Sequence, residues 1–326
     1  MPVALKLIDS EWAKRGAEAR ERFMREARTA ASLRHPNVAT VYHFGIREEN
    51  GQCFCAMELV EGETLEMRVR RTGPLDALTT IDIALQVSSA LAAAEKQGLV
   101  HRDLKPANLM LRRRRAGCER FESRQSRQKL DTVVKVIDFG VAKALVEKPD
   151  AMGLTHGGFV GTPAFASPEQ FTDAQVDVRS DIYSLGATLW YLLTGHRPFE
   201  GATIEQIRAS QHSQALPIEQ LKAARVPSRL MSLLVSMLAP EPAARPGVRA
   251  LTSQLQDCRA PDPRSLESGA PIGSSGRSDR DRGCGLRAVR SVAQPSHVPE
   301  RGACKYLGEK HRRASIRRSQ RRSSQR

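Results

Sequence analysis

The hydrophobic pattern changes its period once along the chain, and this change constrains the fold more than any other feature. The segment "VALKL" at 3–7 has the pattern of a mostly apolar strand with one lysine. Residues 38–46 and 53–60 have the composition of two further strands, and residues 11–33 carry apolar side chains at helical spacing. Long Ala- and Leu-rich helices follow from residue 61, so the sequence predicts an α+β fold.

The apolar periodicity stops after Cys258. The remainder, 259–326, is rich in Ser, Arg, Gly and Pro and holds 17 Lys+Arg against 6 Asp+Glu, which predicts a basic disordered tail. We therefore expect three parts: a small mixed unit at 1–60, a helical unit at 61–258 and this tail.

The formal net charge of +15 comes mostly from two segments. Besides the tail, residues 112–132 hold 8 basic and 3 acidic side chains, whereas the remaining globular part is close to neutral. The basic balance is therefore weak evidence for a nucleic-acid-binding fold. The segment 112–132 is expected to be an insertion that forms a solvated loop, or else a docking patch for an acidic partner or nucleic acid.

Cysteine usage and hydropathy indicate a reducing compartment. The chain has six cysteines in unlike contexts and no CxxC pair, so neither a zinc site nor a disulfide framework is predicted. The apolar runs are shorter than the about 18 residues of a membrane span. The sequence thus predicts a cytoplasmic protein without a membrane span.

Four motifs occur in a fixed order, and three of them carry recognisable chemistry. The sequence reads "VALK" at 3–6, "VHRDLKPANLM" at 100–110, "VKVIDFG" at 134–140 and "GTPAFASPEQ" at 161–170. Together they resemble the catalytic domain of Ser/Thr protein kinases of the eukaryotic type found in bacteria. The resemblance covers residues 1 to about 258 and implies a two-lobed protein-kinase-like fold, with a truncated N-lobe sheet and a helical C-lobe.

The resemblance implies transfer of the ATP γ-phosphoryl group to Ser/Thr hydroxyls of proteins. Asp103 would orient the hydroxyl and accept its proton, and Lys105 would offer a cation to the γ-phosphoryl group. Asn108 and Asp138 would supply oxygen ligands for Mg²⁺.

The resemblance also implies a nucleotide cleft. Lys6 would hold the α- and β-phosphates, steadied by Glu26, although Lys6 also suits a snorkelling edge-strand lysine and Glu26 a partner of Arg22 or Arg25. The remaining residues would contact the adenine: Ala4 and Met110 as a sandwich, Met57 as gatekeeper and the backbone of Glu58 to Val60 as hinge.

Several charged residues are expected to hold the site together. By the resemblance, Asp181 bonds the backbone of the catalytic loop, Glu169 and Arg245 form a buried ion pair, and His101 is a packed core residue. Arg102 would pair with a phosphate on the activation segment. Thr155 is the predicted acceptor of that phosphate, by autophosphorylation, and Thr162 is read as structural.

The family pattern lacks one part here. Kinases place two strands and a glycine-rich loop before the "VALK" strand, and Met1 lies only two residues before that strand. We expect three strands where five are usual, from a start recorded too late or a true truncation. Two alternatives to an active kinase follow: an inactive kinase-like scaffold, and a nucleic-acid-binding protein acting through the tail, where Ser315 also offers an Arg-Arg-Ala-Ser phosphorylation pattern.

Overall fold

The computed structural model describes most of the chain up to residue 260. The described residues are 2–7, 17–47, 49, 51–113, 132–139, 163–172, 175–213 and 215–260. Most of the basic insertion, the predicted acceptor Thr155 and the tail with Ser315 lie outside them, as do Gly140 and Thr162.

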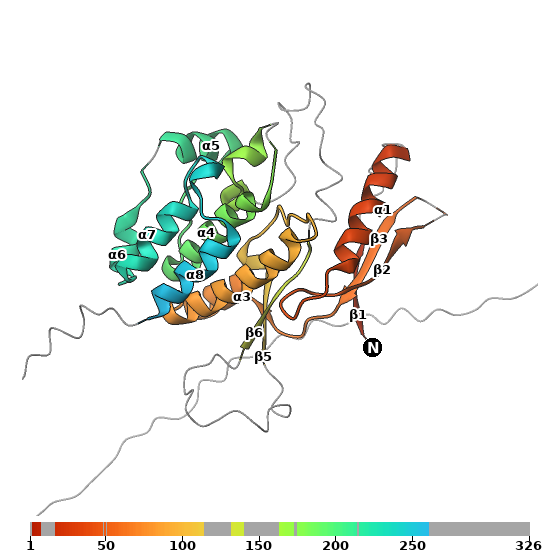
Figure 1. Ribbon diagram of the computed structural model, residues 1–326, viewed down its shortest axis with the longest axis horizontal. Coiled ribbons are helices and arrows are strands. Elements are labelled where there is room, and N and C mark those ends of the chain that lie inside the picture. The colour runs from red at the N-terminus through yellow and green to blue at the C-terminus, as the bar shows by residue number, and fades with distance from the viewer. Residues whose placement is uncertain are drawn as a thin grey trace, which may run out of the picture. The chain divides into compact units, whose positions relative to one another are not determined.

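The N-terminal part is a three-stranded antiparallel sheet with one helix. Its strands are β1 (Val3–Leu7), β2 (Val41–Ile46) and β3 (Cys53–Glu58), in the order β1-β3-β2, and the helix is α1 (Ala17–Ser32), which packs against β2. Figure 1 shows these elements together at the red end of the chain. The predicted three strands are confirmed for the described residues.

The register of this sheet sorts its side chains onto two faces. Ala4 lies opposite Met57 and Lys6 opposite Cys55. Cys55 and Met57 are both buried. They share one face of the sheet because alternate residues of a strand face the same side. Leu5 is 60% exposed, so β1 has an apolar outer face, and its lysine lies on the inner face with the buried residues of β3.

One expected strand begins later than its sequence pattern predicts. The apolar run from Val38 suggests a strand from that residue, but β2 begins at Val41. The backbone before β2 bonds elsewhere: the Ala39 N–H donates to Val136 O (2.9 Å), and the Val136 N–H donates to Asn37 O (2.8 Å). These bonds join the N-terminal part to a strand of the second sheet.

The C-terminal part contains a second sheet and the predicted long helices. Its sheet runs in the order β4 (Glu63–Thr64), β5 (Leu109–Arg113) and β6 (Thr132–Val136). Strands β5 and β6 form an antiparallel hairpin, and most of the basic segment 112–132 lies between them in the sequence. The helices are α2 (Leu65–Thr72), α3 (Ala77–Glu95), α4 (Val178–Thr194), α5 (Ile204–Ser213), α6 (Ile218–Ala223), α7 (Ser228–Met237) and α8 (Val248–Arg259). Short 3-10 helices are η2 (Pro106–Asn108), η3 (Pro163–Phe165), η4 (Pro168–Phe171) and η5 (Pro242–Ala244).

Helix α4 forms the centre of this part. It is apolar almost all round, as the sequence predicts, and Trp190 within it is fully buried and donates to Gln220 Oε1 (2.8 Å). Helix α3 packs against α4 and α8, and α4 also packs against α7. Gly186 allows the last contact, because a Cβ there would lie 3.0 Å from the Met237 Cβ. Gly195 ends α4 with a left-handed φ of 75°.

One described helix, α3, is long and apolar enough to span a membrane by length and composition alone. Its Ile81, Ala84, Val87 and Leu91 are buried in the main core cluster. The apolar character of α3 is therefore accounted for by packing inside the helical part.

Candidate active site

The loop that carries the "HRD" segment is hydrogen-bonded through its backbone to a buried aspartate. Asp181, in the first turn of α4, accepts the His101 N–H (2.7 Å) and the Arg102 N–H (2.8 Å). Burial raises the pKa of the Asp181 carboxyl, and these two hydrogen bonds partly offset that rise. The predicted role of Asp181 matches this geometry, in which the loop takes a left-handed φ of 63° at Arg102.

His101 packs in the core of this loop. Its side chain is fully buried, its Nε2–H donates to Ile137 O (3.0 Å), and its Nδ1 accepts the Asp103 N–H (3.2 Å). The ring meets Phe139 edge-on at 4.7 Å between centroids. His101 thus joins the catalytic loop to the "DFG" segment, as expected of a packed residue.

Two side chains of the loop converge on one carboxylate oxygen of a third. Oδ2 of Asp103 lies 2.9 Å from Lys105 Nζ and accepts a hydrogen bond from Asn108 Nδ2 (3.0 Å). Asn108 Nδ2 also donates to Asp103 O (2.8 Å) and ends the short helix η2. The Asp103 and Lys105 side chains keep 22% and 19% exposure, so the carboxylate is oriented yet still open to solvent.

Lys6 faces the "DFG" aspartate. Its Nζ lies 2.9 Å from Asp138 Oδ2. This carboxylate neutralises the lysine, because a charge on the inner face of a strand requires an opposite charge nearby. Asp138 has a left-handed φ of 61°, a conformation that aspartate tolerates better than most residues. Burial, and next the charge of Asp138, raise the pKa of the nearby Cys55 thiol to about 11. The pairing of Lys6 with Glu26 stays a prediction.

The predicted adenine-contacting residues come from both parts of the chain. Ala4 and Met57 are cross-strand partners in the first sheet, and Val60 is buried just after β3. Met110 lies on β5 opposite Lys135 of β6. Their roles as adenine contacts stay predictions.

A partly buried ion pair at the hinge was not predicted from the sequence. Lys135 Nζ lies 2.7 Å from Glu58 Oε2 and donates to Val38 O (3.2 Å), and the Thr40 N–H donates to the same glutamate oxygen (3.2 Å). Lys135 is 9% exposed. The available signal was a lysine inside the apolar strand "VKV", which needs a buried anion for the same reason as Lys6.

The segment after the activation loop is fixed by the predicted buried ion pair. Arg245 forks onto Glu169 with N–O distances of 2.6 and 2.8 Å, and Ser180 Oγ donates to the same carboxylate. Burial acts to raise the pKa of Glu169, but the hydrogen bonds from Arg245 and Ser180 outweigh it and lower the pKa. The next residue, Gln170, donates to Arg102 O (2.7 Å) and so connects this segment to the catalytic loop.

Comparisons with known proteins agree with this geometry. The family described as "Protein kinase domain" matches residues 1–255. The Ser/Thr protein kinase pkn3 of Myxococcus xanthus is 38% identical over 240 residues, which cover 72% of this chain and 41% of that protein. The Ser/Thr protein kinase PknB of Mycolicibacterium smegmatis is 34% identical over 80% of this chain and 40% of that protein.

Solved structures give the same fold. The PknI kinase domain of Mycobacterium tuberculosis matches with a TM-score of 0.57 at 27% identity, over 78% of this chain and 85% of that one. The structure of Rad53 1–466 in complex with AMP-PNP matches with a TM-score of 0.61 at 23% identity, over 79% and 58% of the two chains. The second likeness concerns the fold alone.

The chain belongs to the protein kinase family. Its fold combines a small sheet N-lobe with a helical C-lobe, and its relatives pkn3 and PknB are Ser/Thr protein kinases. It spans less than half the length of pkn3 and PknB.

Proposed function

We propose that this chain transfers the γ-phosphoryl group of ATP to Ser and Thr hydroxyls of protein substrates. The observation that carries the proposal is the convergence of Lys105 and Asn108 on one oxygen of Asp103, at 2.9 and 3.0 Å. Phosphoryl transfer needs positioned charge more than covalent chemistry, and this arrangement fixes a carboxylate that is still 22% exposed.

In the proposed reaction, Asp103 accepts the proton of the attacking hydroxyl. A new bond forms between that hydroxyl oxygen and the γ-phosphorus, and the bond from the γ-phosphorus to the β–γ bridging oxygen breaks, which leaves ADP. Lys105, 19% exposed beside Asp103, stabilises the negative charge on the moving phosphoryl group.

The donor set suits Mg²⁺. Asn108 and Asp138 offer amide and carboxylate oxygens, the hard ligands that Mg²⁺ prefers. Among the described residues no group of three or more His, Cys, Asp or Glu side chains is placed to hold a metal ion. Mg²⁺ usually keeps several waters and shares substrate phosphates, and the bound ion would neutralise phosphate charge.

The nucleotide is proposed to bind next to the first sheet. Lys6 holds the α- and β-phosphates with support from Glu26. The Lys6 Nζ lies 2.9 Å from Asp138 Oδ2, which places this cation beside the proposed Mg²⁺ ligand. Ala4 and Met110 sandwich the adenine, Met57 is the gatekeeper, and the backbone from Glu58 to Val60 is the hinge. The Glu58–Lys135 pair supports this hinge because it fixes the side chain of its first residue.

The domain limits and compartment are part of this proposal. The N-lobe is taken as 1–60, the C-lobe as 61–258 with the insertion at 112–132, and the tail as 259–326. We assign the protein to the cytoplasm, in support of which Cys53 and Cys55 lie two residues apart as buried free thiols.

Phosphosite mapping tests the proposal. The full chain is incubated with MgATP and a generic basic protein substrate, beside Asp103→Asn and a control, Asp257→Asn, at an exposed position. We expect phosphate on Thr155 or on the substrate with the parent and the control only. Equal phosphorylation by Asp103→Asn, or none by a folded parent that binds ATP, would overturn the proposal.

A further inference from the structure

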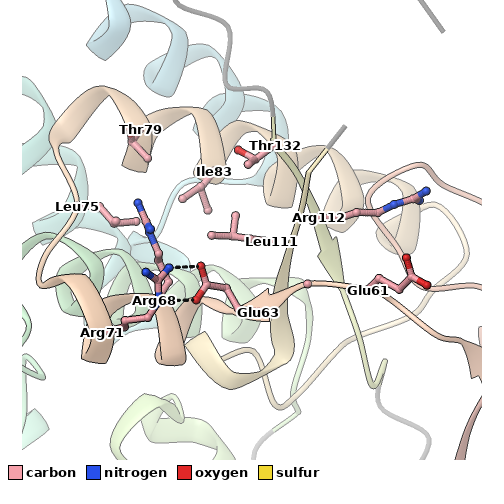
Figure 2. Close-up of a pocket in the computed structure, with 11 residues that line it drawn as sticks. Glu61, Glu63, Arg68, Arg71, Leu75, Thr79, Ile83, Leu111, Arg112 and Thr132 are labelled. Atoms are coloured by element: carbon pink, nitrogen blue, oxygen red, sulfur yellow. Dashed lines mark hydrogen bonds and ion pairs between the residues drawn. The ribbon is translucent and has the colours of Figure 1, made fainter. Parts of the chain in front are cut away.

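A cavity of about 610 Å³ lies in the helical part of the chain, beside the second sheet, and no residue of the candidate active site lines it. Its volume falls within the roughly 300–1,000 Å³ of ligand-binding pockets. Figure 2 shows Ile83 and Leu111 together in its middle and a third apolar side chain, Leu75, at the edge near Arg68. Ile83 is buried and the two leucines pack against the main core, so the apolar base of the cavity is part of the folded core.

One wall of the cavity depends on a glycine. Gly62 has a φ of +159°, and a Cβ there would lie 2.0 Å from the Leu111 carbonyl oxygen. No larger residue allows the chain before β4 to approach β5 this closely. The backbone therefore fixes the shape of this wall.

The acidic residue on α2's side of the cavity is already neutralised. Arg71 forks onto Glu63, with Nη2–Oε1 at 2.7 Å and Nε–Oε2 at 3.2 Å, drawn as dashes in Figure 2. A forked pair of this kind satisfies both carboxylate oxygens. Glu63 is thus already engaged by Arg71.

Arg68, on the same helix, is left with uncompensated charge. Its side chain is half-buried, lines the cavity and makes no ion pair with a described residue. Its helical neighbours three and four positions away are Thr64, Leu65, Arg71 and Thr72, none of them acidic. Glu66, the acid nearest to Arg68 in the sequence, pairs with Arg70 at 3.0 Å on the exposed side of the helix.

A second cation stands across the apolar base. Arg112 lies on the other side of Leu111 from Arg68 in Figure 2. Its Nη1 is 3.9 Å from Glu58 Oε1, the outer limit of an ion pair, and the other oxygen of Glu58 is held by Lys135. The exposed Glu61 lines the same end of the cavity, so Arg68 is the stronger site for an anion.

We propose that this cavity binds an extended segment of a partner protein in which a carboxylate adjoins large apolar side chains. The carboxylate pairs with the guanidinium of Arg68, and the apolar side chains cover Ile83 and Leu111. An arginine fork matches a carboxylate in both geometry and charge. Binding at this surface does not require phosphoryl transfer, so it can be measured whether or not the chain is an active kinase.

The test is fluorescence anisotropy with the full chain and two labelled peptides, at about 0.15 M salt to limit binding to the basic tail. The first peptide is Gly-Ser-Glu-Leu-Phe-Glu-Ser-Gly, and in the second both glutamates are lysine. The variants are Arg68→Glu, Arg68→Gln and the matched control Arg70→Glu, two positions along the same helix. Circular dichroism verifies that each variant is folded.

We expect the glutamate peptide to bind the parent and Arg70→Glu within about twofold of each other. Loss of a charge-assisted fork predicts binding at least about tenfold weaker for both Arg68 variants. The lysine peptide should bind Arg68→Glu better than it binds the parent, which a purely structural role of Arg68 would not produce. Failure of the parent to bind the glutamate peptide, an equal loss in Arg70→Glu, or no gain with the swapped charges would overturn the proposal.

Discussion

Removing the arginine from the buried Arg245–Glu169 pair should destabilise the C-lobe strongly. The Arg245 and Glu169 side chains are 0% and 5% exposed. Arg245 also donates to three backbone carbonyls, those of Ala239, Pro240 and Arg179, at 2.7 to 3.1 Å. Arg245→Met fills similar space but leaves Glu169 as an uncompensated buried charge. Such losses cost about 3–5 kcal/mol, a large part of the roughly 5–15 kcal/mol that holds a domain folded.

The assay is urea denaturation followed by circular dichroism, at neutral pH. Arg249→Met, at an exposed position in α8, is the matched control and should change the free energy of unfolding by less than about 0.5 kcal/mol. The double variant Arg245→Met with Glu169→Gln removes the stranded charge and should recover part of the loss. A loss below about 1 kcal/mol in Arg245→Met, or no recovery in the double variant, would refute this reasoning.

Three further predictions concern the hinge, the core and pH. Lys135→Met removes the nearer of the two cations beside the partly buried Glu58 carboxylate and leaves only Arg112, at 3.9 Å, so the thermal unfolding midpoint should fall by an amount equivalent to about 1–3 kcal/mol; an unchanged midpoint would contradict the role given to this pair. Gly186→Ala places a Cβ 3.0 Å from the Met237 Cβ and should cost about 1–3 kcal/mol in urea denaturation, whereas a gain would show that α7 moves freely. Because the folded-state pKa of Glu169 is lowered, its stabilisation is complete above the unfolded-state pKa of about 4.3 and disappears as the pH falls through the folded-state pKa. Acid titration of stability should therefore be shallower in Glu169→Gln than in the parent, and identical titrations would count against the pair.

Sequence patterns predict the candidate site best where a motif fixes neighbours within a few residues. The positions of Asp103, Lys105 and Asn108 follow from one short loop, and their convergence on a single oxygen agrees with the chemistry read from that loop. The structural roles predicted for Asp181 and His101 are also confirmed. Both residues lie in or directly under motifs that the sequence identifies.

What the sequence did not predict depends on contacts between distant segments. Glu58 and Lys135 are separated by 77 positions, and nothing local to either names the other as a partner. The run from Val38 has strand composition, yet its backbone bonds to β6 and not to the first sheet. The cavity beside Gly62 is lined by residues of five elements, β4, α2, α3, β5 and β6, whose packing no single motif encodes.

The central claim is that the Asp103 carboxylate accepts the proton of the attacking hydroxyl. The most direct test is to measure how much Asp103 contributes to the rate of phosphoryl transfer. The initial rate of phosphoryl transfer from radiolabelled ATP to a basic protein substrate is compared for the parent, Asp103→Asn and Asp257→Asn. The account predicts a rate at least about 10²-fold lower for Asp103→Asn, as expected when a positioned base is removed, and an unchanged rate for Asp257→Asn. Equal rates for the parent and Asp103→Asn would contradict it.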